Sequence, residues 1–161
     1  MRGAIGYELS FNCIRSNPGG FFAWGFLSKA NTDKEIVKVG SLSTLGALVA
    51  KLMISNTEAA YLGVRPTDSS EFFQLTADSK CAQIKFPLVT KEQKDLASKI
   101  TEVAAQNNFP LQETKGSDGA RILDIEITGN ANQISEAVKV LLKGVFDISK
   151  KTRIEYRYRG I

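Results

Sequence analysis

Histidine is absent from this chain of 161 residues. Histidine is the commonest general base, the usual partner of a nucleophilic serine or cysteine, and a frequent zinc ligand. Its absence removes the usual partner of a catalytic triad and most zinc chemistry, although acidic residues, lysine and tyrosine remain available for catalysis. The sequence therefore favours a protein that is not an enzyme, with no catalytic residue, metal site or cofactor to assign.

Cysteine and long apolar runs are also scarce. The only cysteines, Cys13 and Cys81, are far apart, which fits neither a metal site nor a disulfide framework, so we expect two free thiols. The longest apolar stretch, Leu42–Ile54, contains Lys51 and is shorter than the roughly 18 residues of a membrane span. Glu8 precedes any apolar segment, so no secretory signal is expected. We expect a soluble cytoplasmic protein with no membrane partner.

The composition is that of a globular protein, with 43% hydrophobic and 24% charged residues. The length fits one ordinary domain or two small ones. No repeat or linker divides the chain, so any boundary near Asp78 is soft. We place a strand-rich α+β half at residues 1–78 and a second half at residues 79–161, and leave open that the two form one integrated unit.

The second half has the pattern of a ferredoxin-like unit. Alternation of apolar and polar residues predicts four strands: Cys81–Leu88, Leu111–Lys115, Arg121–Thr128 and Arg153–Arg159. Helices are predicted to begin after Thr90, which opens a capping box, and after Asn130. The order strand, helix, strand, strand, helix, strand is typical of the βαββαβ ferredoxin-like arrangement.

The first half is predicted to be of a βββαβ type. Its expected strands are Tyr7–Cys13, Phe21–Leu27, Glu35–Val39 and Ala59–Val64, with a further one at Phe72–Leu75. The helix Leu42–Ile54 carries one charge, where a surface helix would show a polar stripe. Either the chain covers both sides of this helix, or the helix forms a subunit interface. The second alternative predicts a homo-oligomer.

Positive charge collects at the C-terminal end. The sequence predicts a phosphate-contacting surface made of Lys150, Lys151, Arg153, Arg157 and Arg159. The arginines occupy alternate positions, so they share one face of the last strand and Tyr156 and Tyr158 share the other. Such a surface positions phosphates without reading a base sequence. The same charges would also protect an edge strand against unwanted pairing.

Acidic residues argue against RNA binding on the open sheet, which RNA-recognition modules use for base stacking. Asp124 and Glu126 occupy expected outward positions of one middle strand, and Gln83 and Lys85 those of its neighbour. Carboxylates there repel phosphate. We expect them to pair across the sheet with Lys85, Arg153 or Arg157. The leading hypothesis is a non-catalytic binding or assembly protein that contacts nucleic acid or another polyanion through its basic C-terminal strand.

Two loops suggest an alternative function. Each follows a predicted strand and gathers arginine, hydroxyl and turn residues, which suit an anionic group but are also common in ordinary turns. The candidate ligands are Arg15, Asn17, Arg65, Thr67, Asp68 and Ser69. This alternative is a regulatory module that binds a small anion between strand-end loops.

The same loops resemble two segments of the ribonuclease H fold. Asn17-Pro18-Gly19-Gly20 resembles the stretch after that family's first strand, and Thr67-Asp68-Ser69 the triplet after its fourth. The family's first-strand aspartate is replaced by Phe11 or Asn12, and the helix Leu42–Ile54 has no carboxylate. Asp68 alone cannot hold two metal ions. The resemblance covers only the first half of the chain and implies a catalytically inactive scaffold, which is a further alternative.

Overall fold

The structure is a computed structural model that describes residues 34–161. The expected strands Tyr7–Cys13 and Phe21–Leu27 and the candidate ligands Arg15 and Asn17 lie outside the described residues. Within residues 34–161, no helix is long and apolar enough to cross a membrane.

The described chain forms one antiparallel sheet of seven strands in the order β1-β7-β2-β3-β4-β6-β5. The strands are β1 (Ile36–Gly40), β2 (Tyr61–Pro66), β3 (Phe73–Ala77), β4 (Cys81–Leu88), β5 (Leu111–Lys115), β6 (Arg121–Thr128) and β7 (Ile154–Arg159). The helices are α1 (Leu42–Ile54), α2 (Lys91–Asp95), α3 (Ala97–Gln106) and α4 (Ala131–Phe146). The sheet continues through the predicted boundary at residue 78, because β3 pairs with β4.

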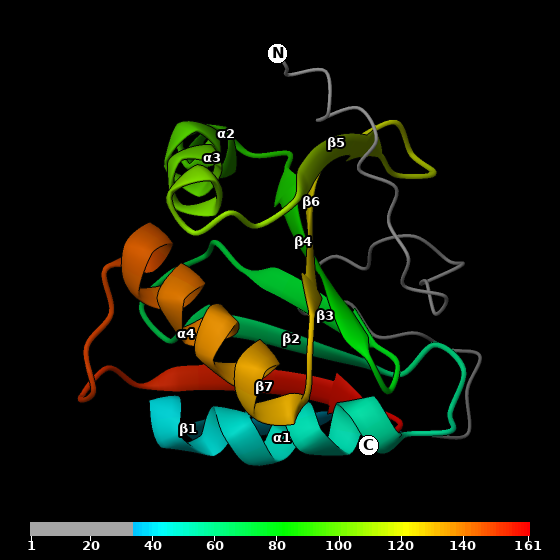
Figure 1. The fold of residues 1–161 in the computed structure, drawn as a ribbon. Coiled ribbons are helices and arrows are strands. Elements are labelled where there is room, and N and C mark those ends of the chain that lie inside the picture. Colours follow the sequence, from blue (N-terminus) through cyan, green and yellow to red (C-terminus); the bar gives the residue numbers. More distant parts are fainter. Residues whose placement is uncertain (1–33) are drawn as a thin grey trace.

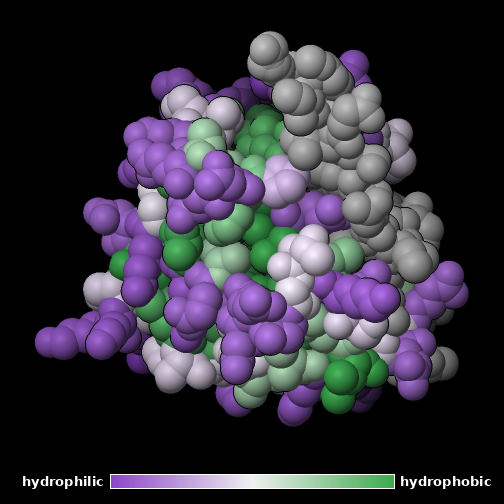
Figure 2. All heavy atoms as spheres, in the orientation of Figure 1, coloured by the Kyte–Doolittle hydropathy of each residue, from purple (hydrophilic) through white to green (hydrophobic). Residues whose placement is uncertain are grey.

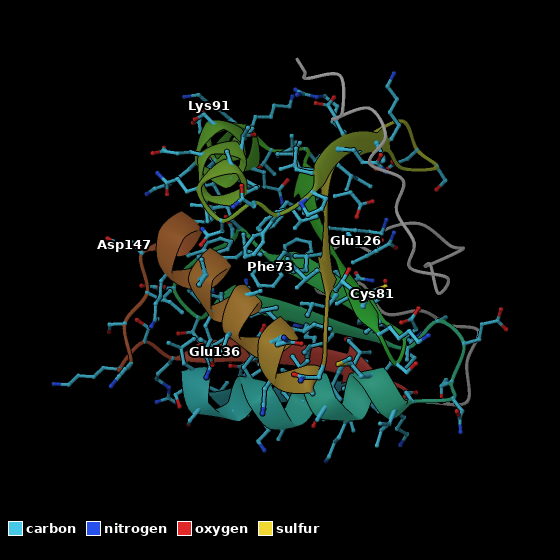
Figure 3. The ribbon with its side chains drawn as sticks, viewed as in Figure 1. Phe73, Cys81, Lys91, Glu126, Glu136 and Asp147 are labelled. Carbon is cyan, nitrogen blue, oxygen red and sulfur yellow. The ribbon has the colours of Figure 1, made fainter. Side chains whose placement is uncertain are left out.

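The helices form a layer on one face of the sheet (Figure 1). The core between the layers takes alternate residues from the strands, such as Phe73, Ile84 and Tyr156, and the apolar faces of the helices. Phe73 and Phe86 pack with ring centroids 5.0 Å apart, and Phe146 of α4 completes this aromatic cluster. In Figure 3, Phe73 lies between the sheet and α4.

The α+β class is confirmed, but the last strand is not where a ferredoxin-like unit requires it. β5, β6 and β4 have the ferredoxin-like order, and β7 should then pair with β4. Instead, the β2–β3 hairpin occupies that position, and β7 lies between β1 and β2. The ferredoxin-like arrangement expected for residues 79–161 is therefore wrong in its strand order, because β7 does not pair with β4.

Local signals account for the helix boundaries. Thr90 accepts a hydrogen bond from the Gln93 amide and forms the predicted capping box. Asn130 accepts one from the Gln133 amide and forms a capping box as well, where only the start of a helix was predicted. The first of these helices is interrupted at Leu96, which ends α2 and precedes α3.

α1 has the predicted bounds, and its apolar side is covered within the chain. Leu45, Val49 and Leu52 are buried against the sheet and α4. The exposed residues are Ser43, Ala47, Lys51 and Ile54. Burial of one side thus explains much of the low charge of α1, which by itself no longer indicates a subunit interface.

Cys81 is disulfide-bonded, so the expectation of a free thiol at this position is wrong. Cys13 lies outside the described residues. Disulfides persist mainly in oxidising compartments. The structure therefore gives no support to the expected cytoplasmic location.

Candidate functional site

Three of the five predicted phosphate-contacting residues lie together after α4. This helix ends in Asp147, a left-handed C-cap with φ 56°, and a hydrogen-bonded turn follows (Figure 3). The Ser149 amide donates to Thr152 Oγ1 over 2.9 Å, and the Lys151 amide donates to Ser149 Oγ over 3.2 Å. The Thr152 amide donates to the Ser149 carbonyl over 3.1 Å. These bonds fix the backbone that carries the cations.

We call Lys150, Lys151 and Arg153 the basic turn. All three side chains are exposed, and none forms an ion pair with a described residue. Figure 2 shows hydrophilic side chains projecting at the border where Figure 1 places the connection from α4 to β7. The basic turn is therefore a compact group of cations available to a ligand.

The other two predicted residues, Arg157 and Arg159, lie inside the sheet. β7 is not the edge strand that its charge suggested, because it pairs with β1 and with β2. Arg157 forms ion pairs with Glu35 at 3.2 Å and Glu155 at 3.5 Å. Arg159 is only 6% exposed, and its guanidinium lies 5.6 Å from the centroid of the Tyr61 ring. The structure therefore separates these two arginines from the basic turn.

The predicted loop after β2 borders a pocket of about 310 Å³. Arg65 is not part of its lining; its guanidinium pairs with Glu155 at 3.1 Å and donates to the Ser69 carbonyl at 3.2 Å. The Thr67 amide donates to the Arg153 carbonyl over 3.1 Å, which joins this loop to the basic turn. Asp68 and Ser69 contribute to the pocket wall.

The charge of the pocket disfavours a small anion. Its ionisable lining consists of Asp68, Glu71 and Asp147 with a single lysine, Lys99. The C-terminal end of α4, which carries the negative end of the helix dipole, also borders it. The loop that was expected to bind an anion therefore presents mainly negative charge.

Sequence reasoning missed a buried polar surface on the sheet face away from the helices. Gln83, Asp124 and Glu126 were expected to face outward on an open sheet, yet all three are buried, as are Gln74 and Thr76 on β3. Figure 3 places Glu126 and Cys81 on this side of the sheet. The sequence shows the polar residues of this surface at alternate positions of three neighbouring strands. Alternation does not reveal, however, whether the face that they form is covered.

One predicted cross-strand pair on this surface is confirmed. Lys85 Nζ lies 2.9 Å from Asp124 Oδ2. Burial raises the pKa of Asp124, and the positive charge of Lys85 opposes this rise. Four buried polar atoms near this pair have no hydrogen-bond partner within the described part of the chain: Gln74 Nε2, Thr76 Oγ1, Gln83 Oε1 and Asp124 Oδ1.

Comparison with protein-family models, curated proteins and solved structures finds no match to this chain. No group of three or more His, Cys, Asp or Glu residues in the described range could hold a metal ion. Of the two segments that resemble ribonuclease H, Asn17–Gly20 lies outside the described residues and Asp68 is an exposed residue of the pocket wall.

Proposed function

We propose that the protein is a non-catalytic binding protein that contacts a polyanion, with nucleic acid as the first candidate, through the basic turn. The observation that supports this function is the grouping of Lys150, Lys151 and Arg153. All three are exposed and have no carboxylate partner in residues 34–161, and hydrogen bonds fix the turn that carries them.

Phosphate contacts of this kind release counterions from the polyanion, and this release drives sequence-independent binding. Arg157 and Arg159 are not part of the proposed surface, because the first is held in ion pairs and the second is buried. The contact is therefore limited to about three phosphates, and the expected affinity is that of non-specific binding, roughly 10⁻⁴ to 10⁻⁶ M.

The proposed surface offers little for reading bases. Tyr156 is buried, and Tyr158 packs against the core. Stacking of bases on aromatic side chains, which strengthens binding of single strands, is therefore not expected from β7. Single-stranded and double-stranded nucleic acid should bind with similar affinity, and different base sequences should bind equally.

The test compares two triple variants in titrations of fluorescently labelled DNA at low salt. Lys150→Ala/Lys151→Ala/Arg153→Ala removes the basic turn. The control, Lys51→Ala/Lys91→Ala/Lys94→Ala, removes the same charge from exposed lysines of α1 and α2. We expect the first variant to lose at least about tenfold in affinity, since each lost phosphate contact weakens binding. The control should stay within about threefold of the wild type.

Two outcomes would contradict the proposal. Equal losses in both triple variants would mean that only net charge matters, and a wild-type protein that binds neither DNA, RNA nor heparin would leave the basic turn without this role. Parallel titrations with heparin and with RNA identify the polyanion. Binding to heparin but not to DNA or RNA would mean that the basic turn is a polyanion site whose ligand is not nucleic acid.

A further inference from the structure

β1 is an edge strand with an unusually apolar surface. Within the described chain it ends the sheet, pairing with β7 on one side only. Ile36, Val37 and Val39 are 47%, 49% and 43% exposed. Lys38 is the only charged residue between Ile36 and Gly40. An exposed apolar edge of this kind is a template for pairing with another strand.

The opposite edge of the sheet shows the contrast. Among residues 34–161, β5 ends the sheet on that side, and it carries the polar residues Gln112, Glu113, Thr114 and Lys115. Glu113 also forms an ion pair with Arg121 at 2.8 Å. Charge on an edge strand discourages pairing with another chain. The chain thus protects one edge of its sheet and leaves the other apolar.

We propose that β1 pairs antiparallel with β1 of a second copy, so that the two sheets become continuous. Directly opposed residues of an antiparallel pair lie on the same face, as Ile36 and Tyr158 do within the chain. When a two-fold axis relates the two β1 strands, one residue must therefore lie directly opposite the same residue of the second copy. We name each register by this central residue. This condition leaves few registers for the short strand β1.

Strand length and charge select among these registers. Centring on Val39 would place Ile36 opposite Leu42 of the second copy, where α1 has already begun. Centring on Lys38 places two ammonium groups opposite each other, and centring on Ile36 places Lys38 opposite the partner's Lys34; both are destabilising. Centring on Val37 places Val37 opposite the partner's Val37, and Ile36 opposite the aliphatic stem of the partner's Lys38. This register pairs apolar surface with apolar surface and opposes no like charges, which is why a second copy is the favoured occupant.

α1 lies at the same border of the molecule as β1. Figure 1 shows α1 running in front of β1 along one border of the molecule. The outer side of α1 consists of Ser43, Ala47 and Lys51 with the apolar Ile54, which is 79% exposed.

Disulfide cross-linking tests the register. Val37→Cys places one thiol opposite its own copy in the second chain, so mild oxidation should give a covalent dimer on a non-reducing gel. Ile36→Cys faces the partner's Lys38 and should cross-link at least about fivefold less. Val89→Cys, on an exposed residue outside the sheet, is the control for random collision. Equal cross-linking at all three positions, or more at Ile36→Cys than at Val37→Cys, would overturn the proposal.

The mass in solution provides the second measurement. Wild-type protein at high micromolar concentration should scatter light as twice the monomer mass of 17.6 kDa. Val37→Lys places two ammonium groups opposite each other at the two-fold axis, and should be a monomer with an unchanged circular-dichroism spectrum. A monomeric wild-type protein at about 100 µM, or a Val37→Lys variant that remains a dimer, would refute pairing through β1. Neither result depends on binding to a polyanion.

Discussion

Lys85→Met tests how much the Lys85–Asp124 ion pair, on the buried polar surface of the sheet, contributes to the stability of the fold. Lys85 Nζ lies 2.9 Å from Asp124 Oδ2, and the two side chains are 15% and 4% exposed. At this distance two unit charges attract by about 6 kcal/mol if the effective dielectric constant is about 20. Much of this attraction offsets the cost of removing the charged groups from water. Methionine keeps most of the length of the side chain but leaves the carboxylate without its cation.

We expect Lys85→Met to lower the free energy of unfolding by about 3–5 kcal/mol near neutral pH. This is the cost of leaving one charge of a buried ion pair without its partner. Urea denaturation followed by circular dichroism measures this loss. Lys80→Met, at an exposed lysine, is the matched control and should change stability by less than about 0.5 kcal/mol. Adding Asp124→Asn to Lys85→Met should recover a large part of the loss, because a neutral amide is less costly to bury than a carboxylate.

The pH dependence gives an independent check. Burial raises the pKa of Asp124, and Lys85 is the main influence that lowers it. Loss of Lys85 raises that pKa further above the unfolded value of about 4. A group with a raised folded-state pKa contributes stability that is full below the unfolded pKa and is lost as pH rises through the folded pKa. The loss in Lys85→Met should therefore shrink as pH falls from about 7 to about 5. A loss below about 1 kcal/mol that does not vary with pH would refute this reasoning.

Further substitutions test the packing of β7 and of Gly160, the residue that follows it. Tyr156→Phe removes the hydroxyl that donates to the Ser41 carbonyl over 2.6 Å. We expect urea denaturation to show that the free energy of unfolding falls by about 1–3 kcal/mol. An unchanged denaturation midpoint would mean that this hydrogen bond does not stabilise the fold. Gly160→Ala should destabilise the fold more than Gly119→Ala. Both glycines have positive φ, but a Cβ at Gly160 would lie 2.9 Å from Thr57 Cγ2, whereas Gly119 has open space. Equal melting temperatures of the two variants would contradict that close approach.

Most elements could be predicted because their determinants are local. The bounds of α1, β4, β5 and β6 are those expected from alternation, helical periodicity and turn residues within a few positions of each element. The interruption at Leu96 was not expected, because the apolar positions before and after it fit one continuous helical face.

The order of the strands could not be predicted from these local patterns. Alternation shows which residues of a strand share a face, but not which strand lies beside it. The ion pair of Arg157 with Glu35 joins residues 122 positions apart, and it exists because β7 is inserted beside β1. The same insertion buries Arg159, which the sequence placed on a solvent-exposed surface.

Part of the candidate site could be predicted from the sequence, and the charge of the pocket could not. Lys150, Lys151 and Arg153 are exposed because they lie in and just after a turn, where the pattern of the nearby sequence is informative. The pairing of Lys85 with Asp124 followed from the expected alignment of two neighbouring strands. The negative charge of the pocket was not apparent, because Glu71 and Asp147 come from segments that only the folded chain brings together.

The salt dependence of nucleic-acid binding by the wild-type protein tests the proposed function most directly. Three phosphate contacts predict that the logarithm of the binding constant falls with the logarithm of the salt concentration, with a slope of about −2 to −3. Removal of the basic turn should bring that slope close to zero. A wild-type slope near zero, or no detectable binding at low salt, would contradict the proposal that Lys150, Lys151 and Arg153 contact phosphates.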